Sequence, residues 1–322
     1  MHTVTIPNTD LHVSSLCLGT AEFGAAISGN DAYRLLDAFV DAGGTFIDTA
    51  NVYADWIPGT KSSSEKLIGL WLTDRGRRDR IVLATKGAHP PLSDMNAGRL
   101  RPADIVYDLE QSLGHLRTDV IDLYWLHRDD PTQPVASIVE TLAAQIQAGK
   151  LRAWGVSNWR TERIAAAQSY AAQAGLPPIV ANQPQWSLAV TDPNGIADKT
   201  VAVMDAAMHA YHVQTGLACI PFSSQAQGVL HKLAAGAPER IRPHQHQVYP
   251  LGANRVRAAA AQRLADELGV SLTAIVLGYL QSQPFVTVPI VGARTVEHLR
   301  DSLAGDGVRL TPEQLARLDA AQ

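Results

Sequence analysis

The stretch from Ile81 to His127 contains a strand, a helix and a second strand in the order IVLATKG (81–87), PADIVYDLEQSLGHL (102–116) and IDLYWLH (121–127). The two outer runs are short, apolar and rich in β-branched and aromatic residues, which is typical of buried strands. The middle segment repeats apolar residues at helical spacing and has Pro102 near its start, a favoured place for proline. The stretch therefore predicts a βαβ unit with parallel strands.

The same alternation continues along the chain in both directions without a linker or a shift in composition. Eight such units close naturally into a (β/α)8 barrel. We therefore expect one TIM-barrel domain over residues 1–322 with extra loops at its C-terminal face, although 322 residues by themselves would suggest two domains. The remaining expected strands are 16–20, 45–50, 153–158, 179–185, 218–223 and 287–292.

Two segments of the second half lead to more specific expectations. The run DKTVAVMDAAMHAYHVQTG (198–216) predicts a helix. The run GAPERIRPHQHQVYPLG (236–252) is rich in Gly, Pro and His, and it predicts a mobile loop over the top of the barrel. Two histidines in such a loop, His244 and His246, are too few for a metal site, so we expect no metal.

Composition excludes several classes of partner and site. The formal net charge of −4 gives no reason to expect nucleic acid or an anionic membrane as a partner. No apolar run reaches the ~20 residues of a membrane helix. Cys17 and Cys219 cannot form a disulfide framework, which favours a cytoplasmic location. The sequence also lacks G-x-G-x-x-G, a P-loop, H-E-x-x-H, G-x-S-x-G and paired C-x-x-C motifs.

Ionisable residues stand at the ends of three consecutive expected strands. Asp48, Lys86 and His127 end these strands, and Tyr53 follows Asp48 in the next loop. Each residue alone has an ordinary structural explanation as a cap, a surface aromatic, an ion-pair partner or a core histidine. Because the carboxyl ends of barrel strands meet at one mouth, however, the four side chains are expected to converge there.

This group of residues suggests proton delivery from a phenol. A nearby Lys86 would lower the pKa of Tyr53, while Asp48 keeps the lysine charged and in place. His127 could donate a hydrogen bond to a carbonyl oxygen on which negative charge develops. The hydride for such a reduction has to come from a cofactor.

The segments DTANVY, ATKG, LH, GVSN, NQ and GAR resemble, in this order, the aldo-keto reductase superfamily, in particular its bacterial general aldo/keto reductases. The resemblance covers nearly the whole chain. It implies NADP(H)-dependent reduction of an aldehyde or ketone, or the reverse oxidation of an alcohol, without a Rossmann domain. It also places the family's catalytic tetrad on Asp48, Tyr53, Lys86 and His127, with Tyr53 as general acid.

The resemblance further implies cofactor contacts spread over the barrel mouth. Ser157, Asn158 and Gln183 would hold the nicotinamide carboxamide, whose donors and acceptors such side chains match. Six further residues are implied: Thr20 near the nicotinamide ribose, Phe222 against the nicotinamide ring, Ser223 at the pyrophosphate, Arg294 at the 2′-phosphate, and Glu297 and His298 on the adenine side. Without the resemblance, each of these residues could equally be a helix cap, a core residue or a solvated side chain.

Some positions depart from the family's pattern. Position 222 is Phe where many members have Tyr or Trp, a change that preserves stacking. Val288 stands where some members carry a second cation toward the 2′-phosphate, so NAD(H) is also possible. His298 and Ser302 replace amide side chains that are common among related sequences.

The expected substrate is a small-molecule carbonyl or alcohol. Loop residues would line its pocket: Trp56, the loop 88–101, Arg128 with Asp129, and Trp186. Aromatic walls with a few polar groups suit a sugar or a small aromatic carbonyl equally well. Trp56 and Trp186 could instead anchor loops on the barrel, and the sequence leaves the oligomeric state undetermined.

Two other functions compete with hydride transfer. Lys86 at a barrel strand end could be the nucleophile of a Schiff-base lyase or aldolase. Alternatively, the chain could be a non-catalytic sensor that binds NADP(H) and a protein partner.

Overall fold

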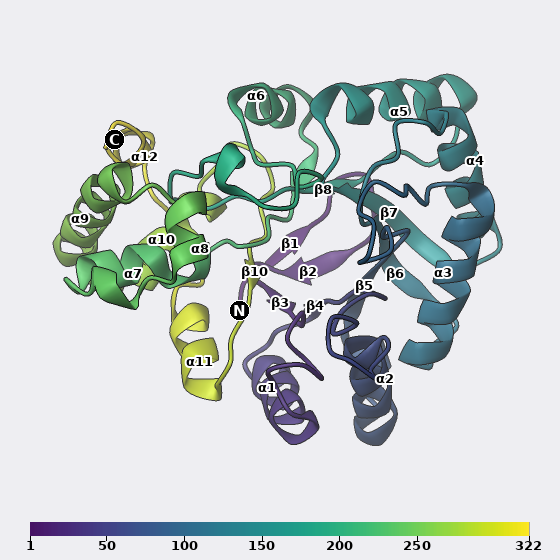
Figure 1. The fold of residues 1–322 in the computed structure, drawn as a ribbon, viewed down its shortest axis with the longest axis horizontal. Helices are drawn as coiled ribbons and strands as arrows, with labels where there is room; N and C mark the ends of the chain where they lie inside the picture. The colour runs from purple at the N-terminus through teal and green to yellow at the C-terminus, as the bar shows by residue number, and fades with distance from the viewer. Residues whose placement is uncertain (322) are drawn as a thin grey trace.

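Parallel strand pairing joins eight strands in the order β10-β3-β4-β5-β6-β7-β8-β9, as shown by the computed structural model, which describes residues 1–321 (Figure 1). The strands are β3 (Cys17–Gly19), β4 (Phe46–Asp48), β5 (Val82–Gly87), β6 (Ile121–Leu126), β7 (Leu151–Ser157), β8 (Ala181–Gln183), β9 (Ala218–Cys219) and β10 (Ile290–Val291). Each lies within or overlaps an expected strand. Every residue of β5 and β6 is buried, as in a parallel sheet that is covered on both faces.

The sheet closes on itself between β9 and the segment before β10. Cys219 forms a parallel bridge with Thr287, and its N–H donates to the Val286 carbonyl at 2.8 Å. The Val288 and Ile290 N–H groups donate in turn to Cys219 and Pro221 at 2.9 and 3.0 Å. These bonds complete the ring, so the predicted (β/α)8 barrel is confirmed. The last residue of the expected domain, Gln322, lies outside the described residues.

Helices surround the barrel and bury their apolar faces against it (Figure 1). Three of these helices end at a glycine in a left-handed conformation, namely Gly76, Gly175 and Gly216. The helices that alternate with the strands are α1 (Gly29–Asp41), α2 (Ser63–Arg75), α3 (Pro102–Leu116), α4 (Val135–Gln147), α5 (Thr161–Ala174), α6 (Ala206–Thr215), α10 (Leu272–Gln281) and α11 (Val296–Ala304).

An antiparallel hairpin that was not among the expected elements closes the barrel at the N-terminal ends of its strands. It consists of β1 (Thr3–Thr5) and β2 (His12–Ser14). Ile6, Leu11 and Val13 are at most 1% exposed and pack with Phe46 and other residues of the barrel interior. The opposite end of the barrel is therefore the one available for a site.

The helix expected over 198–216 begins only at Ala206. Asp205 caps it by accepting a hydrogen bond from the Met208 N–H at 2.7 Å, and Val203 forms a bridge with Gln185. Residues 198–205 are instead tied to the C-terminal ends of the strands, because the Ala202 N–H donates to the Asn158 side-chain oxygen at 3.2 Å. Local capping and pairing thus replace the first turns of the expected helix.

The long loop expected over 236–252 contains the short helix α8 (Pro243–Val248). Pro243 stands at the first helical position, and the Arg242 N–H donates to the Gln245 side chain at 2.9 Å. Gln245 is fully buried and donates to the Gln227 carbonyl at 3.3 Å. The segment is therefore anchored on the loop that follows β9, which the Gly/Pro/His-rich composition did not predict.

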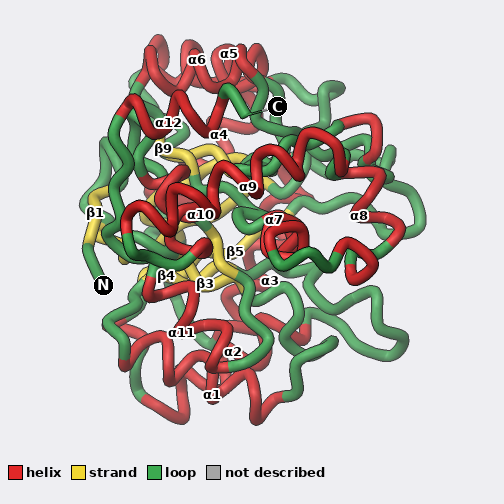
Figure 2. The backbone as a smooth tube through the Cα atoms, turned by 90° about the vertical axis from the view of Figure 1, so that its left-hand side faces the viewer, coloured by secondary structure: helices red, strands yellow, loops and turns green. Residues whose placement is uncertain are grey.

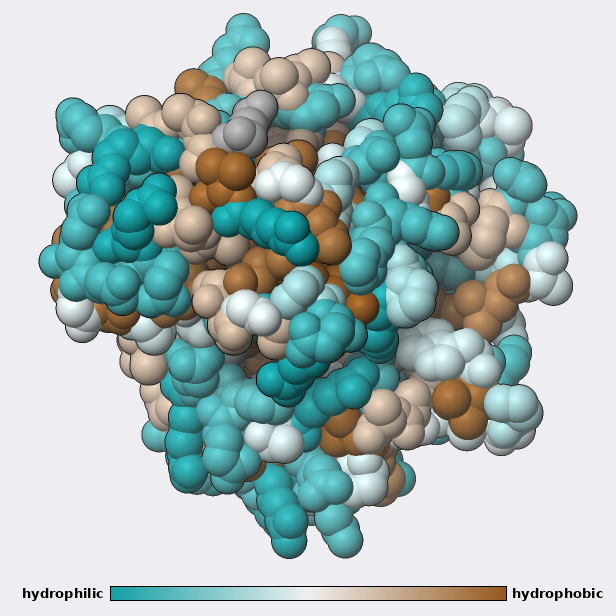
Figure 3. All heavy atoms as spheres, turned by 60° about the vertical axis from the view of Figure 1, so that its left-hand side comes forward, coloured by the Kyte–Doolittle hydropathy of each residue, from teal (hydrophilic) through white to brown (hydrophobic). Residues whose placement is uncertain are grey.

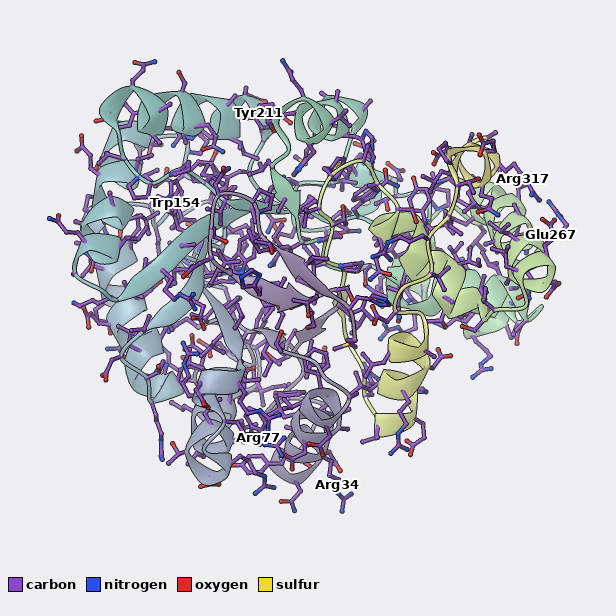
Figure 4. The ribbon with its side chains drawn as sticks, turned by 180° about the vertical axis from the view of Figure 1, so that it is seen from behind. Arg34, Arg77, Trp154, Tyr211, Glu267 and Arg317 are labelled. Atoms are coloured by element: carbon purple, nitrogen blue, oxygen red, sulfur yellow. The ribbon has the colours of Figure 1, made fainter. Side chains whose placement is uncertain are left out.

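Helices α7 (Val229–Ala234), α8, α9 (Leu251–Leu268) and α12 (Pro312–Asp319) form an outer layer on one side of the barrel (Figures 1 and 2). Arg317 of α12 and Glu267 of α9 point toward each other and form two hydrogen bonds of 2.8 and 3.0 Å (Figure 4). On the face over these helices, hydrophobic residues appear as patches between hydrophilic ones (Figure 3). Among residues 1–321, no helix is both long and apolar enough to cross a bilayer.

Helices α2 and α3 pack unusually closely at Gly69. A Cβ atom at this position would lie 2.2 Å from the His115 carbonyl oxygen. Only glycine therefore allows the two backbones to approach to this distance. The contact holds the helix after β4 against the helix after β5.

We predict that Gly69→Ala destabilises the protein by about 1–3 kcal/mol, because one of the two helices has to shift. Gly114→Ala in α3 is the matched control, since a Cβ there meets nothing within 4 Å. That change should stabilise by about 0.5–1 kcal/mol through a better helix propensity. Urea unfolding measures both variants, and equal stabilities would contradict the close helix contact.

Candidate active site

Four predicted residues come together at the C-terminal end of the barrel. Asp48 ends β4, Lys86 lies in β5 and His127 directly follows β6. Tyr53 lies in the turn after β4, where its N–H donates to the Ala50 carbonyl at 3.1 Å. The loop ends of neighbouring parallel strands thus bring these side chains to one place, as the sequence predicts.

The ammonium group of Lys86 is the centre of this arrangement. It donates hydrogen bonds to the Asp48 carboxylate, to the Thr49 carbonyl at 2.9 Å and to the Tyr53 hydroxyl at 2.8 Å. All three ammonium protons therefore have acceptors, although the side chain is only 1% exposed. Burial alone would lower the pKa of Lys86, but the Asp48 charge and the Tyr53 hydroxyl raise it above its ordinary value. The lysine is held as a cation.

The Asp48 carboxylate is held by Lys86 on β5 and by Gln183 on β8. Burial raises the pKa of this carboxyl, and the charge of Lys86 and the Gln183 amide oppose that rise. Gln183 Nε2 donates to Asp48 Oδ1 at 3.1 Å. The carboxylate therefore anchors Lys86 and at the same time orients an amide from β8.

The phenol of Tyr53 keeps its proton in this environment. Burial raises the pKa of Tyr53 and the Asp48 charge adds to the rise, while the attraction of Lys86 lowers it by less. From the sequence, Lys86 is expected to lower the pKa of Tyr53, and this expectation is wrong. The loss of hydration raises the pKa by more than the Lys86 ammonium lowers it. Tyr53 is half-buried and carries a proton that it can donate.

His127 is a neutral ring that faces Tyr53. Their ring centroids lie 5.9 Å apart in an edge-to-face arrangement. Burial lowers the pKa of His127 well below its ordinary value, and the charge of Arg128 adds to this. Within residues 1–321, Nδ1 is buried and has no hydrogen-bond partner, whereas Nε2 is not among the buried atoms without a partner. A buried N–H without an acceptor is costly, so the proton is favoured on Nε2, which then offers a donor.

A buried carboxylate that sequence reasoning did not identify lies behind the lysine. Glu65 in α2 is fully buried and accepts hydrogen bonds from Thr85 at 2.6 Å and Asn51 at 3.4 Å. It also pairs with His115 at 2.9 Å. Thr85 adjoins Lys86, and Asn51 is two residues before Tyr53. The available signal was an acid on the buried face of α2, in helical spacing with Ile68.

The predicted carboxamide-binding residues lie beside the tetrad. Ser157 and Gln183 are 1% exposed, and the Ser157 hydroxyl donates to the Gln183 carbonyl at 2.9 Å. Asn158, with a positive φ of 61°, donates to the His127 carbonyl at 3.2 Å. The amide of Asn158 is therefore fixed by a bond to the residue after β6, and that of Gln183 by its bond to Asp48 at the end of β4. Thr20 is brought near them but is fully buried, and its hydroxyl donates to the Asp48 carbonyl at 2.9 Å.

The loop after β9 carries the residues predicted for the ring and the pyrophosphate. Phe222 is half-buried and packs on the hydrophobic residues inside the barrel. Ser223, Ala226 and Gln227 all have positive φ values, between 47° and 54°. Three left-handed residues so close in sequence cost energy, and such strain often occurs at ligand-binding loops.

Arg294 lies just before α11, Glu297 and His298 lie in its first turn, and all three are exposed. Within residues 1–321, no carboxylate lies within ion-pair distance of Arg294. Backbone N–H groups and Thr295 hold the pKa of Glu297 below its usual range. The guanidinium of Arg294 is thus available to an anion.

The three residues predicted for the substrate pocket differ in position. Trp56 is 45% exposed, with its ring edge-to-face to Tyr53 at 6.4 Å. Arg128 lies beside His127 but is bound to Asp198 at 3.0 Å and to the Thr200 hydroxyl at 2.8 Å. Trp186 is 8% exposed and packs away from the tetrad against Phe285, His209 and Tyr279. Its expected place in the pocket wall is not what the structure shows, because the ring fills the space under the outer helices.

A second histidine completes the mouth and was not predicted individually. His89 follows β5 and lies edge-to-face with His127, with the ring centroids 4.7 Å apart. Within the expected pocket loop 88–101, its signal was a lone histidine three residues after Lys86. As for metals, no group of three or more His, Cys, Asp or Glu side chains in residues 1–321 is arranged to hold an ion.

Comparisons with known proteins agree with this geometry. The sequence model of the "Aldo/keto reductase family" matches residues 15–322. Among curated proteins, the uncharacterized oxidoreductase YrpG of Bacillus subtilis is 33% identical, over 97% of this chain and 93% of its own length. Norsolorinic acid reductase stcV of Emericella nidulans is 30% identical, over 99% of this chain and 80% of its own.

Two further proteins extend the comparison. An NADP(+) aryl-alcohol dehydrogenase of Phanerodontia chrysosporium is 30% identical, over 99% of this chain and 85% of its own. The crystal structure of the thermostable aldo-keto reductase Tm1743 in complex with the inhibitor epalrestat superimposes with a TM-score of 0.75. The alignment covers all of both chains at 23% identity, which supports the shared fold.

We predict that Asp48→Asn and Lys86→Met each destabilise the protein by about 3–5 kcal/mol, because each leaves one buried polar or charged partner unpaired. The double variant should cost clearly less than the sum of the two single changes. Glu267→Gln, which removes an exposed pair, is the control and should cost less than about 1 kcal/mol. Additive losses in urea unfolding would show that the buried pair is not coupled.

Proposed function

The chain belongs to the aldo/keto reductase family, and from this premise we propose that it is an oxidoreductase that reduces an aldehyde or ketone to an alcohol, or catalyses the reverse reaction. The observation that carries the proposal is the hydrogen-bonded chain from Asp48 through Lys86 to the Tyr53 hydroxyl. A half-buried phenol that retains its proton beside a fixed cation suits a general acid.

Each member of the tetrad has a separate task in this proposal. Tyr53 gives its proton to the carbonyl oxygen, so that its own O–H bond breaks as the alcohol O–H bond forms. Lys86 then stabilises the phenolate at 2.8 Å, and Asp48 holds the lysine in position. His127 offers its Nε2–H to the same oxygen and orients it.

The proposed cofactor is NADP(H), with NAD(H) as a second possibility. When bound, the nicotinamide would supply or accept the hydride. Several features of the chain suit it: fixed amides at 158 and 183, the half-buried Phe222 ring, the strained loop 223–227, and Arg294, which is exposed and has no ion-pair partner among the described residues. Thr20 suits it least, because its side chain is buried and its hydroxyl is already bonded.

The exposed guanidinium of Arg294 favours NADP(H) over NAD(H), since it matches a 2′-phosphate. Val288, where a second cation would help, is fully buried in the barrel interior. One of the relatives carries NADP(+) in its name. The preference is therefore proposed to rest on one arginine.

For the substrate, an aromatic carbonyl or benzylic alcohol fits better than a sugar. Trp56 presents a 45% exposed ring beside Tyr53, and Ile57 and Leu92 are exposed in the surrounding loops. Arg128 is already bound to Asp198 and has few donors left for sugar hydroxyls. Norsolorinic acid reductase and aryl-alcohol dehydrogenase among the relatives are consistent with this choice.

The two competing functions fit less well. A Schiff-base nucleophile has to be a neutral amine, whereas Lys86 is a cation bonded to three acceptors. Borohydride trapping with a carbonyl compound should therefore leave Lys86 unlabelled. A non-catalytic sensor has no need for the complete tetrad, and turnover with a carbonyl panel distinguishes it.

The unpaired, buried Cys17 and Cys219 fit the cytoplasmic location expected from the sequence.

Tyr53→Phe tests the general acid. We predict a loss of about 10²–10⁴-fold in kcat for carbonyl reduction, because the variant lacks the proposed proton donor. Binding of NADPH, measured by quenching of tryptophan fluorescence, should stay close to that of the unchanged protein. Full activity of the variant would remove Tyr53 from the proposed role.

Arg294→Ala tests the cofactor preference. The dissociation constant for NADPH should rise at least about tenfold, the effect of losing a hydrogen bond to a charged group, while that for NADH changes little. Arg300→Ala is the matched control, since Arg300 is an exposed arginine of α11, the helix that follows Arg294. Equal weakening of both cofactors by Arg294→Ala would argue against the assigned phosphate contact.

A further inference from the structure

His89 presents a hydrogen-bond acceptor beside the proposed reaction centre. It stands two residues beyond the end of β5, and its ring lies 4.7 Å from that of His127 at an interplanar angle of 68°. The ring is 9% exposed. It therefore borders the same mouth as His127 and Tyr53 without being part of the tetrad.

One hydrogen bond fixes the tautomer of His89. Its Nδ1 lies 2.6 Å from the Pro90 carbonyl oxygen, which can only accept a hydrogen bond. Nδ1 therefore carries the proton and Nε2 carries a lone pair. Burial lowers the pKa of His89 to about 4, with the charge of Arg128 adding to this, so the ring is neutral at physiological pH.

The neighbouring ring has the opposite arrangement. Among the described residues, His127 Nδ1 has no hydrogen-bond partner and is buried, which favours the proton on Nε2. His89 Nε2 and His127 Nε2 are not among the buried polar atoms that lack a partner, and no hydrogen bond within residues 1–321 uses them. The two rings thus offer an acceptor and a donor side by side.

The two arginines near His89, Arg99 and Arg128, already donate hydrogen bonds to other acceptors. Arg128 donates to Asp198, Thr200 and the His127 carbonyl. Arg99 forms two bonds of 2.8 Å with Asp108, and it donates to the His89 carbonyl at 3.2 Å rather than to the ring. The acceptor on His89 is thus left for a ligand, and the backbone that carries it is held in place.

We propose that His89 is a specificity-determining residue that accepts a hydrogen bond from a hydroxyl group on the carbon next to the reacting carbonyl. The inference rests on the proposed function and narrows its substrate class to α-hydroxy ketones and aldehydes. In such compounds a carbonyl acceptor and a hydroxyl donor sit on adjacent carbons. The carbonyl oxygen would accept from His127 Nε2, and the neighbouring hydroxyl would donate to His89 Nε2.

Two ketones of nearly equal shape test this. 2-Hydroxyacetophenone carries the hydroxyl, and propiophenone has a methyl group in its place. The ratio of their kcat/KM values with NADPH is measured for the unchanged protein and for His89→Phe, which keeps a planar ring but has no acceptor. Dividing the two ratios removes the intrinsic difference in reactivity between the ketones.

We expect the ratio to fall about tenfold in His89→Phe, as for the loss of one hydrogen bond, with propiophenone turned over almost as before. His89→Gln, which retains an acceptor oxygen, should keep part of the preference. Tyr107→Phe, at an exposed position of α3 outside the loops around the site, is the control and should leave the ratio unchanged. An unchanged ratio in His89→Phe, or an equal loss for both ketones, would overturn the assignment.

A measurement on the unchanged protein does not depend on the folding of any variant. As product inhibitors, 1-phenyl-1,2-ethanediol should bind about tenfold more tightly than 1-phenyl-1-propanol. Equal inhibition constants would contradict a hydroxyl site at His89. If the protein binds NADPH but reduces neither ketone nor any carbonyl of a broad panel, the proposed function itself fails, and this inference fails with it.

Discussion

The rest of the structure depends on the buried ion pair between Lys86 and Asp48. A cation and a carboxylate that are almost fully excluded from water are tolerable only if their remaining polar atoms are bonded. Thr49, Tyr53 and Gln183 supply those bonds, so the first turn after β4 and the end of β8 take positions dictated by the pair. Glu65 adds a second buried carboxylate behind them and joins α2 to β5 and to the turn after β4. The residues at the mouth of the barrel are therefore arranged around the Lys86–Asp48 ion pair.

Burial also decides where protons reside at this mouth. It keeps the phenol of Tyr53 protonated and both histidines neutral. A neutral imidazole has one donor and one acceptor, and its local partners decide which of them faces outward. Nδ1 of His89 donates to the Pro90 carbonyl, whereas Nδ1 of His127 has no partner within residues 1–321. The Nε2 atoms of the two side chains therefore differ: that of His89 is an acceptor and that of His127 a donor.

Sequence periodicity and motif order predicted the eight strands and the meeting of Asp48, Tyr53, Lys86 and His127, because both follow from the geometry of repeated βα units. Features that depend on tertiary contacts were not predictable in this way. The hairpin β1–β2 is stabilised by the open end of a barrel that it does not help to form, and α8 is held by Gln245 binding to a loop 18 residues earlier. Trp186 could be assigned to neither the mouth nor the core without knowing the direction of the turn that follows β8. The net rise of the Tyr53 pKa required the depth of burial, and the roles of His89 and Glu65 required knowledge of their partners.

The seam that closes the barrel has a consequence for how a ligand and the fold depend on each other. β9 and β10 have two residues each, and the sheet closes there through a single bridge and a few backbone bonds. The loop 223–227 follows β9, and Arg294 follows β10, so the segments proposed for the pyrophosphate and the 2′-phosphate begin on opposite sides of this seam. A dinucleotide that contacts both the loop 223–227 and Arg294 would link β9 and β10, the two shortest strands of the barrel. By linkage, its binding free energy would also resist the local opening of the barrel, and the seam would exchange its amide hydrogens more slowly in the bound state.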